Sequence, residues 1–169
     1  MSKAFTRESD EVPAWPEPPR RVAVLPPGQK NYLTPAGARQ MREALERLVE
    51  VERPRLAAAT DDDAKRRLAA LDQRIRQLHE ALQSAEVVGP PPPPWNEVRF
   101  GATVTVRDRR GEASRYCIVG IDEADADRDR VSWLSPIARA LLNDRLGQRI
   151  RFRFPAGEEE LEITAITYE

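Results

Sequence analysis

Apolar residues recur at steps of three and four through residues 34–88, which is the spacing of one face of a helix. In the first half of this segment the recurring positions are Met41, Leu45, Leu48, Val49 and Leu56. The second half alternates steps of three and four, as in a coiled-coil seam, at Leu68, Leu71, Ile75, Leu78, Leu82 and Ala85. This pattern predicts two helices of about 25 residues, each roughly 35–40 Å long.

Signals for the start, the middle and the end of these helices are also present. Thr34 can cap the free amide groups of a first turn, and Pro35 suits the first helical position. Pro54 is expected to kink or end the first helix, because proline lacks an amide proton and crowds the preceding turn. The stretch from Thr60 to Asp63 is long enough only for a tight reversal. We therefore expect an antiparallel α-helical coiled-coil hairpin with an acidic turn at its tip.

From residue 98 onward the hydrophobic period changes to two, which indicates strands. One helix interrupts them, with Ser135 as its cap, Pro136 in its first turn and Gly147 as its stop. The expected fold class is α+β, with the hairpin followed by a small antiparallel sheet and one helix. The predicted strands contain residues 98–100, 103–106, 116–119, 131–134, 150–154 and 161–166.

Proline marks the boundaries between these parts. Six of the 15 prolines fall in residues 1–33, and five form the run from Pro90 to Pro94. Proline-rich segments favour extended chain over packed structure. The predicted organisation is a flexible tail (1–33), the coiled-coil hairpin (34–88), a polyproline linker (89–96) and a C-terminal domain (97–169).

Charge and composition narrow the classes of function. The 27 basic and 28 acidic residues produce no whole-chain field that would attract nucleic acid or an anionic membrane. One cysteine and one histidine exclude a disulfide framework and the usual zinc sites, so Cys117 is predicted as a core thiol and His79 as a surface residue. No apolar run approaches the roughly 20 residues of a membrane span, and no signal peptide is recognised. We expect a cytoplasmic protein that does not contact membranes.

The sharpest chemical feature is the acidic cluster Asp61, Asp62 and Asp63 at the predicted tip. Three carboxylates can contribute to binding Mg²⁺, which prefers one or two carboxylates with water and substrate phosphates completing its shell. The competing interpretation is a helix start, with Thr60 and Asp63 as a capping box and the acids opposing the positive end of the helix dipole. We favour the cap, and no intrinsic metal site is predicted.

Two other charged stretches have weaker interpretations. Lys65, Arg66 and Arg67 are candidates for phosphate contact, although no aromatic residue is interleaved for base stacking and a solvated face is the simpler interpretation. Residues 122–129 begin like a calcium loop, but Arg130 stands where glycine is needed and Pro136 where glutamate is needed, so a solvated loop is expected. A single histidine without a plausible serine partner makes no triad, and no catalytic residue is assigned.

Several longer stretches together resemble the GreA/GreB family of bacterial transcription elongation factors, nearer to GreB. The order and spacing of these stretches are as informative as their residues, and the resemblance extends from about Asn31 to the end of the chain. The stretches are NYLTPAG (31–37), ERP (52–54), FGATV (100–104), IVGIDEAD (118–125), SPIARALL (135–142), PAGE (155–158) and ITY (166–168).

The resemblance implies a C-terminal domain of FKBP-like fold that docks on RNA polymerase at the rim of its secondary channel. It further implies that the hairpin enters the channel, where tip acids help hold the Mg²⁺ of the polymerase, and that the polymerase itself cleaves backtracked RNA. The protein is then no enzyme, binds no cofactor beyond a shared Mg²⁺, and meets nucleic acid only indirectly within the elongation complex. Leu134, Ser135, Pro136, Ile137 and Ala138 match the docking loop, with Leu134 where members often have a polar residue.

The hairpin departs from the family pattern. Family members carry a tip motif of Asp, two residues and Glu-Asn on arms that are longer by about two heptads in total. Removing about seven residues from each arm shortens the projection by roughly 10 Å, too far for Asp61, Asp62 or Asp63 to reach the polymerase metal. The expected function is therefore a non-cleaving, short-arm regulator that competes with longer Gre factors.

Three alternatives stay open at this point. The chain is a full transcript-cleavage factor if a different docking angle compensates for the short arms. Prolyl isomerase activity is a weaker possibility, because an FKBP-like fold alone does not license that chemistry. An oligomerisation scaffold is the third, although the two matching stripes favour pairing within one chain across a short turn, and hence a monomer.

Overall fold

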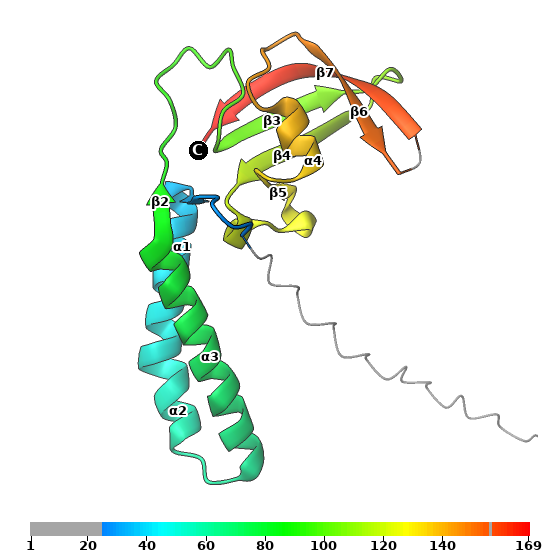
Figure 1. Cartoon of the computed structure of the whole chain (residues 1–169). Coiled ribbons are helices and arrows are strands. Elements are labelled where there is room, and N and C mark those ends of the chain that lie inside the picture. Colours follow the sequence, from blue (N-terminus) through cyan, green and yellow to red (C-terminus); the bar gives the residue numbers. More distant parts are fainter. Residues whose placement is uncertain (1–24, 156) are drawn as a thin grey trace, which may run out of the picture.

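The structure is a computed structural model that describes residues 25–155 and 157–169. It consists of a helical hairpin and a five-stranded sheet that carries one short helix, so the predicted mixture of α and β structure is confirmed. Figure 1 shows the hairpin projecting away from the sheet. Its base lies beside the turn formed by residues 121–123, at one end of the sheet. Most of the predicted tail, residues 1–24, lies outside the described residues.

The first arm of the hairpin contains α1 (Pro35–Arg47), the π-helical η1 (Leu48–Glu52) and α2 (Arg53–Ala57), and the second arm is α3 (Asp62–Ser84). The arms lie side by side and are joined by a short turn at the far end (Figure 1). α1 begins as predicted, since the Thr34 side chain accepts a hydrogen bond from the amide of Gly37 and Pro35 occupies the first turn. At 1.5 Å per residue, the 23 residues of α3 extend roughly 35 Å.

The first arm stays helical through Pro54, where the sequence predicted a kink or an end. The turn before this proline is π-helical, and the amide of Arg53 donates to the carbonyl of Leu48, five residues earlier. Proline has no amide proton to donate and its ring crowds the preceding turn, so a wider turn accommodates it. Pro54 then occupies the first turn of α2, a position where the missing proton costs little.

The hairpin is best packed at its base, next to the sheet. Met41 and Leu78 are buried there together with Leu33 and Ala38, and partly buried residues of both arms surround them. The apolar stripe of the first arm is less regular than predicted at the π-helical turn, which contains Val49. Val49, a predicted member of the stripe, is 43% exposed.

The sheet contains five strands in the order β5-β4-β3-β7-β6. Neighbouring strands run antiparallel except for the β4–β5 pair, so the predicted wholly antiparallel sheet is wrong for that pair. The turns η2 (Ile121–Glu123) and η3 (Ala126–Arg128) bring the chain back beside the end of β4, so β5 runs in the same direction as β4. The strands are β3 (Ala102–Arg107), β4 (Ala113–Val119), β5 (Arg130–Ser132), β6 (Arg149–Phe154) and β7 (Gly157–Tyr168).

The short helix α4 (Pro136–Leu141) packs on the sheet and completes the main hydrophobic core. Ser135 caps it as predicted, accepting a hydrogen bond from the amide of Ala138. The predicted stop at Gly147 is wrong, because α4 ends at Leu141 and Asn143 already has a left-handed backbone with φ of 70°. The fully buried side chains of this core include Val98, Val104, Val106, Ile118, Leu141 and Ile163.

Two short strands join the base of the hairpin to the rest of the chain. β1 (Asn31–Leu33) pairs in parallel with β2 (Ala85–Val87), so residues 31–33 are ordered strand rather than part of a tail. The predicted linker is also anchored, because Trp95 packs against Tyr168 with ring centroids 5.4 Å apart and its indole N–H donates to Pro91. Within the described residues, no helix is long and apolar enough to cross a membrane.

Candidate functional site

The acidic cluster lies at the turn between α2 and α3, at the far end of the hairpin. Asp61 is the N-cap of α3, and its carboxylate accepts a hydrogen bond from the amide of Ala64 at 2.8 Å. The cap is therefore Asp61, and the predicted capping box from Thr60 to Asp63 is wrong by one residue. Asp63 lies in the first turn of α3, where its charge opposes the positive end of the helix dipole.

The other two carboxylates of the tip are paired with cations one turn later. Lys65 Nζ lies 3.0 Å from Asp62, and Arg67 Nη2 lies 2.8 Å from Asp63. All four side chains are exposed, so these pairs contribute little to stability. Among the residues that the structure describes, no group of three His, Cys, Asp or Glu side chains is placed to hold a metal ion. The observed contacts of the tip acids are those of a helix start.

Replacing the cap residue is expected to destabilise the hairpin measurably. Asp61→Ala removes the acceptor for the Ala64 amide, and loss of such a cap costs about 1 kcal/mol. Asp62→Ala is the matched control, since it removes an equal charge from the same turn but no cap. Urea unfolding followed by far-ultraviolet circular dichroism checks the difference. An equal shift in both variants would show that charge, and not capping, is what Asp61 contributes.

The three predicted phosphate-contacting cations lie on the exposed first turns of α3. Two of them, Lys65 and Arg67, are already paired with tip acids. Arg66 is exposed and makes no ion pair within the described part of the chain. Because the cations and acids of the tip largely neutralise one another, the tip is not a basic patch.

The five predicted docking residues do not lie on one surface. Ile137 and Ala138 lie on the face of α4 that is buried in the core, with 9% and 0% of their surface exposed. Pro136 is exposed, and Leu134 and Ser135 are half-buried in the turn that leads into the helix. The buried pair seats the turn on the sheet, and the other three side chains are the ones available to a partner.

A charged ladder that was not singled out from the sequence runs along β6 and β7. The register places Arg149 opposite Glu162, Arg151 opposite Glu160 and Arg153 opposite Glu158. The alternation of arginine with apolar residues in β6 was the available signal. Such opposite-charge pairs stabilise the pairing of strands and discourage other chains from adding to the exposed edge of β6.

Glu160 of this ladder pairs with two arginines, Arg109 and Arg149. A hydrogen bond from Arg109 at 3.1 Å, together with the charge of that guanidinium, lowers the pKa of Glu160 below its usual value. Arg149 and Arg151 add to the effect. The charged form of Glu160 is therefore favoured over a wider range of acidic pH than that of an isolated glutamate.

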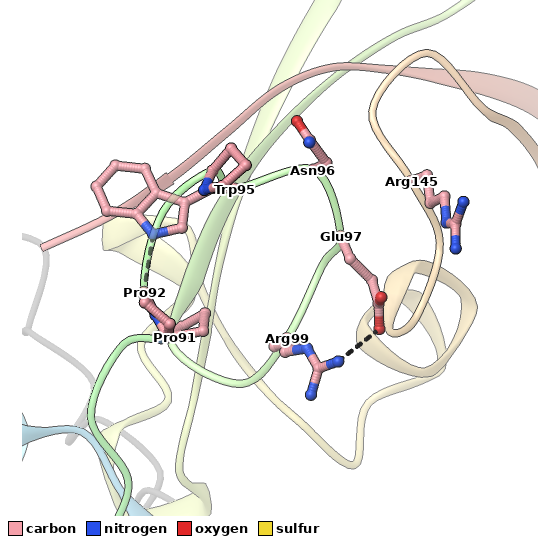
Figure 2. Close-up of a pocket in the computed structure, with 8 residues that line it drawn as sticks. Pro91, Pro92, Trp95, Asn96, Glu97, Arg99 and Arg145 are labelled. Atoms are coloured by element: carbon pink, nitrogen blue, oxygen red, sulfur yellow. Dashed lines mark hydrogen bonds and ion pairs between the residues drawn. The ribbon is translucent and has the colours of Figure 1, made fainter.

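An open pocket of about 520 Å³ lies between the proline-rich segment that was predicted as a linker and the loop before β6 (Figure 2). Trp95 is the aromatic residue among those that line it, and Arg99 pairs with Glu97 at 3.2 Å along one side. Tyr168 packs against Trp95, and its hydroxyl accepts from the amide of Arg99 and donates to the carbonyl of Glu97. The aromatic side chains here hold the linker on the sheet and do not form an aromatic binding box.

The base of the hairpin contacts the sheet domain at a buried carboxylate, that of Glu123, and we call this contact the joint. Glu123, at the end of η2, is 8% exposed and accepts hydrogen bonds from the backbone amides of Thr34 at 2.9 Å and Gly120 at 3.0 Å. Its other oxygen accepts from the hydroxyl of Thr34. Sequence reasoning assigned this glutamate to a solvated loop, and nothing in the acidic run distinguishes it from its exposed neighbours. Only the pairing with Thr34, 89 residues away, shows its position.

Three further side chains surround this contact. The side-chain amide of Asn31 donates to Ala81, Ser84 and Asp122, linking α3 to η2. The ring of Tyr32 lies between Phe100 and Trp133, with centroid distances of 5.7 and 5.2 Å. The stretches NYLTPAG and GIDEAD, quoted above for their resemblance, therefore meet at this joint.

Comparison with known proteins identifies the family to which these features belong. The family model for the C-terminal part of the transcription elongation factors GreA/GreB matches residues 92–168. The chain is 38% identical to GreB of Neisseria meningitidis serogroup B over 154 residues, which cover 82% of this chain and 94% of that relative. It is 37% identical to GreB of Pseudomonas aeruginosa over 164 residues, covering 89% and 95% of the two chains.

A solved structure is also similar, that of the GreA factor homolog 1 (Gfh1) protein of Thermus thermophilus. It is 26% identical, with a TM-score of 0.40, and the match covers 82% of this chain and 99% of the other.

Both relatives contain more residues in the matched region than this chain does. The match with the Neisseria protein spans 154 residues but only 82% of the 169 residues of this chain, or about 139, so about 15 residues of the relative have no counterpart. The match with the Pseudomonas protein spans 164 residues and 89% of this chain, about 150, which leaves a similar difference. Identity above 30% over nearly the whole relative nevertheless leaves no doubt about descent, and the chain belongs to the GreA/GreB family of transcription elongation factors.

Proposed function

We propose that this chain is a short-arm Gre-type regulator that occupies the secondary channel of bacterial RNA polymerase without stimulating RNA cleavage. The observation that carries the proposal is the difference in length from its relatives. About 15 residues of each relative have no counterpart, which equals about two heptads. We place this difference in the hairpin, whose second arm is 23 residues long.

The consequence of shorter arms is geometric. Seven residues fewer in each arm shorten the hairpin by roughly 10 Å. Coordination of Mg²⁺ requires oxygen ligands at about 2 Å, so a carboxylate that stops 10 Å short contributes nothing to a metal site. The contacts of Asp61, Asp62 and Asp63 within their own helix agree with this, because capping and ion pairing with Lys65 and Arg67 explain them without a metal.

The proposed docking surface is the turn before α4. Leu134, Ser135 and Pro136 present accessible side chains there, while Ile137 and Ala138 hold the turn on the core. In this proposal the chain is a monomer with no cofactor of its own, it is not an enzyme, and it meets nucleic acid only inside the elongation complex. The acidic tip acts at most on charges within about 8–10 Å, the screening length at physiological salt.

A competition experiment tests the proposal. Excess chain, added to backtracked elongation complexes whose RNA is being cleaved with the help of a long-arm GreB, is expected to slow cleavage, and more GreB is expected to restore the rate. Gel analysis of the 3′-terminal RNA fragments measures both effects. The Pro136→Asp variant, altered at the exposed docking turn, should compete less well than Gln73→Asp, altered on the exposed face of α3.

The alternative outcomes are distinct. Unchanged cleavage at saturating excess would contradict docking at the shared site. Stimulated cleavage that disappears in the Asp61, Asp62 and Asp63 triple alanine variant would show that the chain is itself a transcript-cleavage factor. A stable dimer in light scattering that dissociates on Leu78→Asp would favour the oligomerisation scaffold instead.

A further inference from the structure

The joint between the hairpin and the sheet domain depends on one buried, ionisable side chain. Glu123 reaches from η2 into the start of α1, where Thr34 supplies two of its three hydrogen-bond donors and Gly120 supplies the third. A buried carboxylate is costly unless it is well bonded, and these three donors satisfy it. The bonds are directional, so they define an angle as well as a contact.

The two glycines of the joint show how closely the parts approach. A Cβ atom added to Gly37 would lie 1.7 Å from Oε1 of Glu123, and one added to Gly120 would lie 2.0 Å from the carbonyl oxygen of Tyr32. Neither glycine has a positive φ angle, so the absence of a side chain serves close packing and not backbone conformation. The glutamate thus occupies the space that a side chain on α1 would need.

The other contacts of the joint are less specific in direction. Of the bonds from the Asn31 amide, the one that reaches the sheet domain goes to Asp122 and is 3.3 Å long, and the bond from Arg130 to Gln40 is 3.4 Å and exposed. The rings around Tyr32 bury apolar area, which tolerates rotation and sliding. Glu123 is therefore the contact best able to restrict the hairpin to a single direction.

We propose that Glu123 is a positioning residue that locks the helical hairpin in one direction relative to the sheet domain. The lock acts through the amide and hydroxyl of Thr34, at the N-terminus of the arm whose far end is the acidic tip. A small change of angle at the joint moves a tip roughly 35 Å away by several ångströms. This inference rests on the proposed function for its consequence, since an undirected hairpin must be ordered before it enters a channel, and that ordering weakens binding.

Distance measurements on the free protein test the lock directly. Spin labels at Ala70→Cys on α3 and Arg110→Cys on the β3–β4 turn, both exposed positions, report the angle in a Cys117→Ala background. Pulsed electron resonance should show one narrow distance distribution in the parent protein. Glu123→Ala should at least double its width, whereas Glu123→Gln should stay close to the parent because an amide oxygen still accepts from the amides of Thr34 and Gly120.

A pair of glycine substitutions provides the steric test. Gly37→Ala should broaden or shift the distribution, because its methyl group displaces Glu123. Gly89→Ala is the matched control, since an added Cβ there meets nothing within 4 Å. Circular dichroism must show full helix content in each variant, so that a broad distribution reports a loosened joint and not an unfolded arm. If Glu123→Ala keeps the parent distribution, the lock is overturned, whatever Gly37→Ala does.

A second experiment separates this inference from the proposed function. If the lock and the proposed function both hold, half-maximal inhibition in the competition assay should require about ten-fold more of the Glu123→Ala variant than of the parent protein. The Glu123→Gln variant should inhibit at nearly the parent concentration. If the parent protein does not compete at all, the proposed function fails while the distance measurement still decides the lock. If distances broaden but competition is unchanged, the lock exists but the direction of the hairpin does not matter for binding, which overturns the consequence drawn here.

Discussion

If the proposed function holds, lengthening both arms of the hairpin by seven residues is expected to turn this chain from a competitor into a factor that stimulates RNA cleavage. The insertion adds about two helical turns per arm, or roughly 10 Å of reach. The new tip would carry the family motif of Asp, two residues and Glu-Asn in place of residues 60–63. Whole heptads preserve the seam in which Leu78 packs with Met41 of the first arm, because the apolar stripe returns to the same face.

The measurement is the rate of RNA release from a backtracked complex, which should rise at least ten-fold over the parent chain, a change of about 1.4 kcal/mol in barrier. Two controls separate reach from chemistry. Lengthened arms whose tip acids are replaced by alanine should compete without stimulating cleavage. The family tip motif placed on arms of the present length should also fail to stimulate, and cleavage in that variant would contradict the explanation by length.

Leu141→Ala is expected to produce the largest loss of stability among the substitutions considered. This residue ends α4, is fully buried and belongs to the main core. Truncating a buried leucine to alanine costs about 2–5 kcal/mol, from lost burial and from the cavity left behind. If the turn from Leu134 to Pro136 is the docking surface, as proposed, the same variant should also bind polymerase more weakly, because α4 holds this turn on the core.

Urea unfolding of the full chain measures this loss, and Leu146→Ala provides the comparison. Leu146 lies five residues further on and is 47% exposed, so its truncation should change stability by about 0.5 kcal/mol or less. Similar destabilisation by both variants would mean that α4 does not anchor the core as described.

The elements that the sequence predicted well are those that depend on nearby residues. The start of α1 follows from Thr34 and Pro35, and the start of α4 follows from Ser135 and Pro136, because a cap bonds to amides two or three residues away. The strands β3, β4, β6 and β7 follow from an alternation that one face of a sheet imposes on each strand separately. The acidic tip was placed correctly at the turn, although its cap is Asp61 and not Thr60.

Competing local signals account for most of the errors. Pro54 ends a typical helix, but a π-helical turn allowed the arm to continue beside α3. Gly147 is a good stop signal, but Asn143 reverses the chain first so that the loop can reach the start of β6. Such local signals are weak guides, because tertiary context routinely overrides them.

By itself, then, the sequence determined two helical arms, an acidic turn between them, a set of strands and a resemblance to a family, since all of these are written in short-range patterns. Only the tertiary structure decided that β5 runs parallel to β4 and that residues 31–33 form a strand with residues 85–87. It alone brought Glu123 to Thr34. A carboxylate in an acidic run is solvated unless donors surround it, and two of the three donors to Glu123 belong to Thr34, 89 residues earlier. Contacts across such separations depend on the whole fold, so the pattern that predicted the hairpin could not show how its base meets the sheet domain.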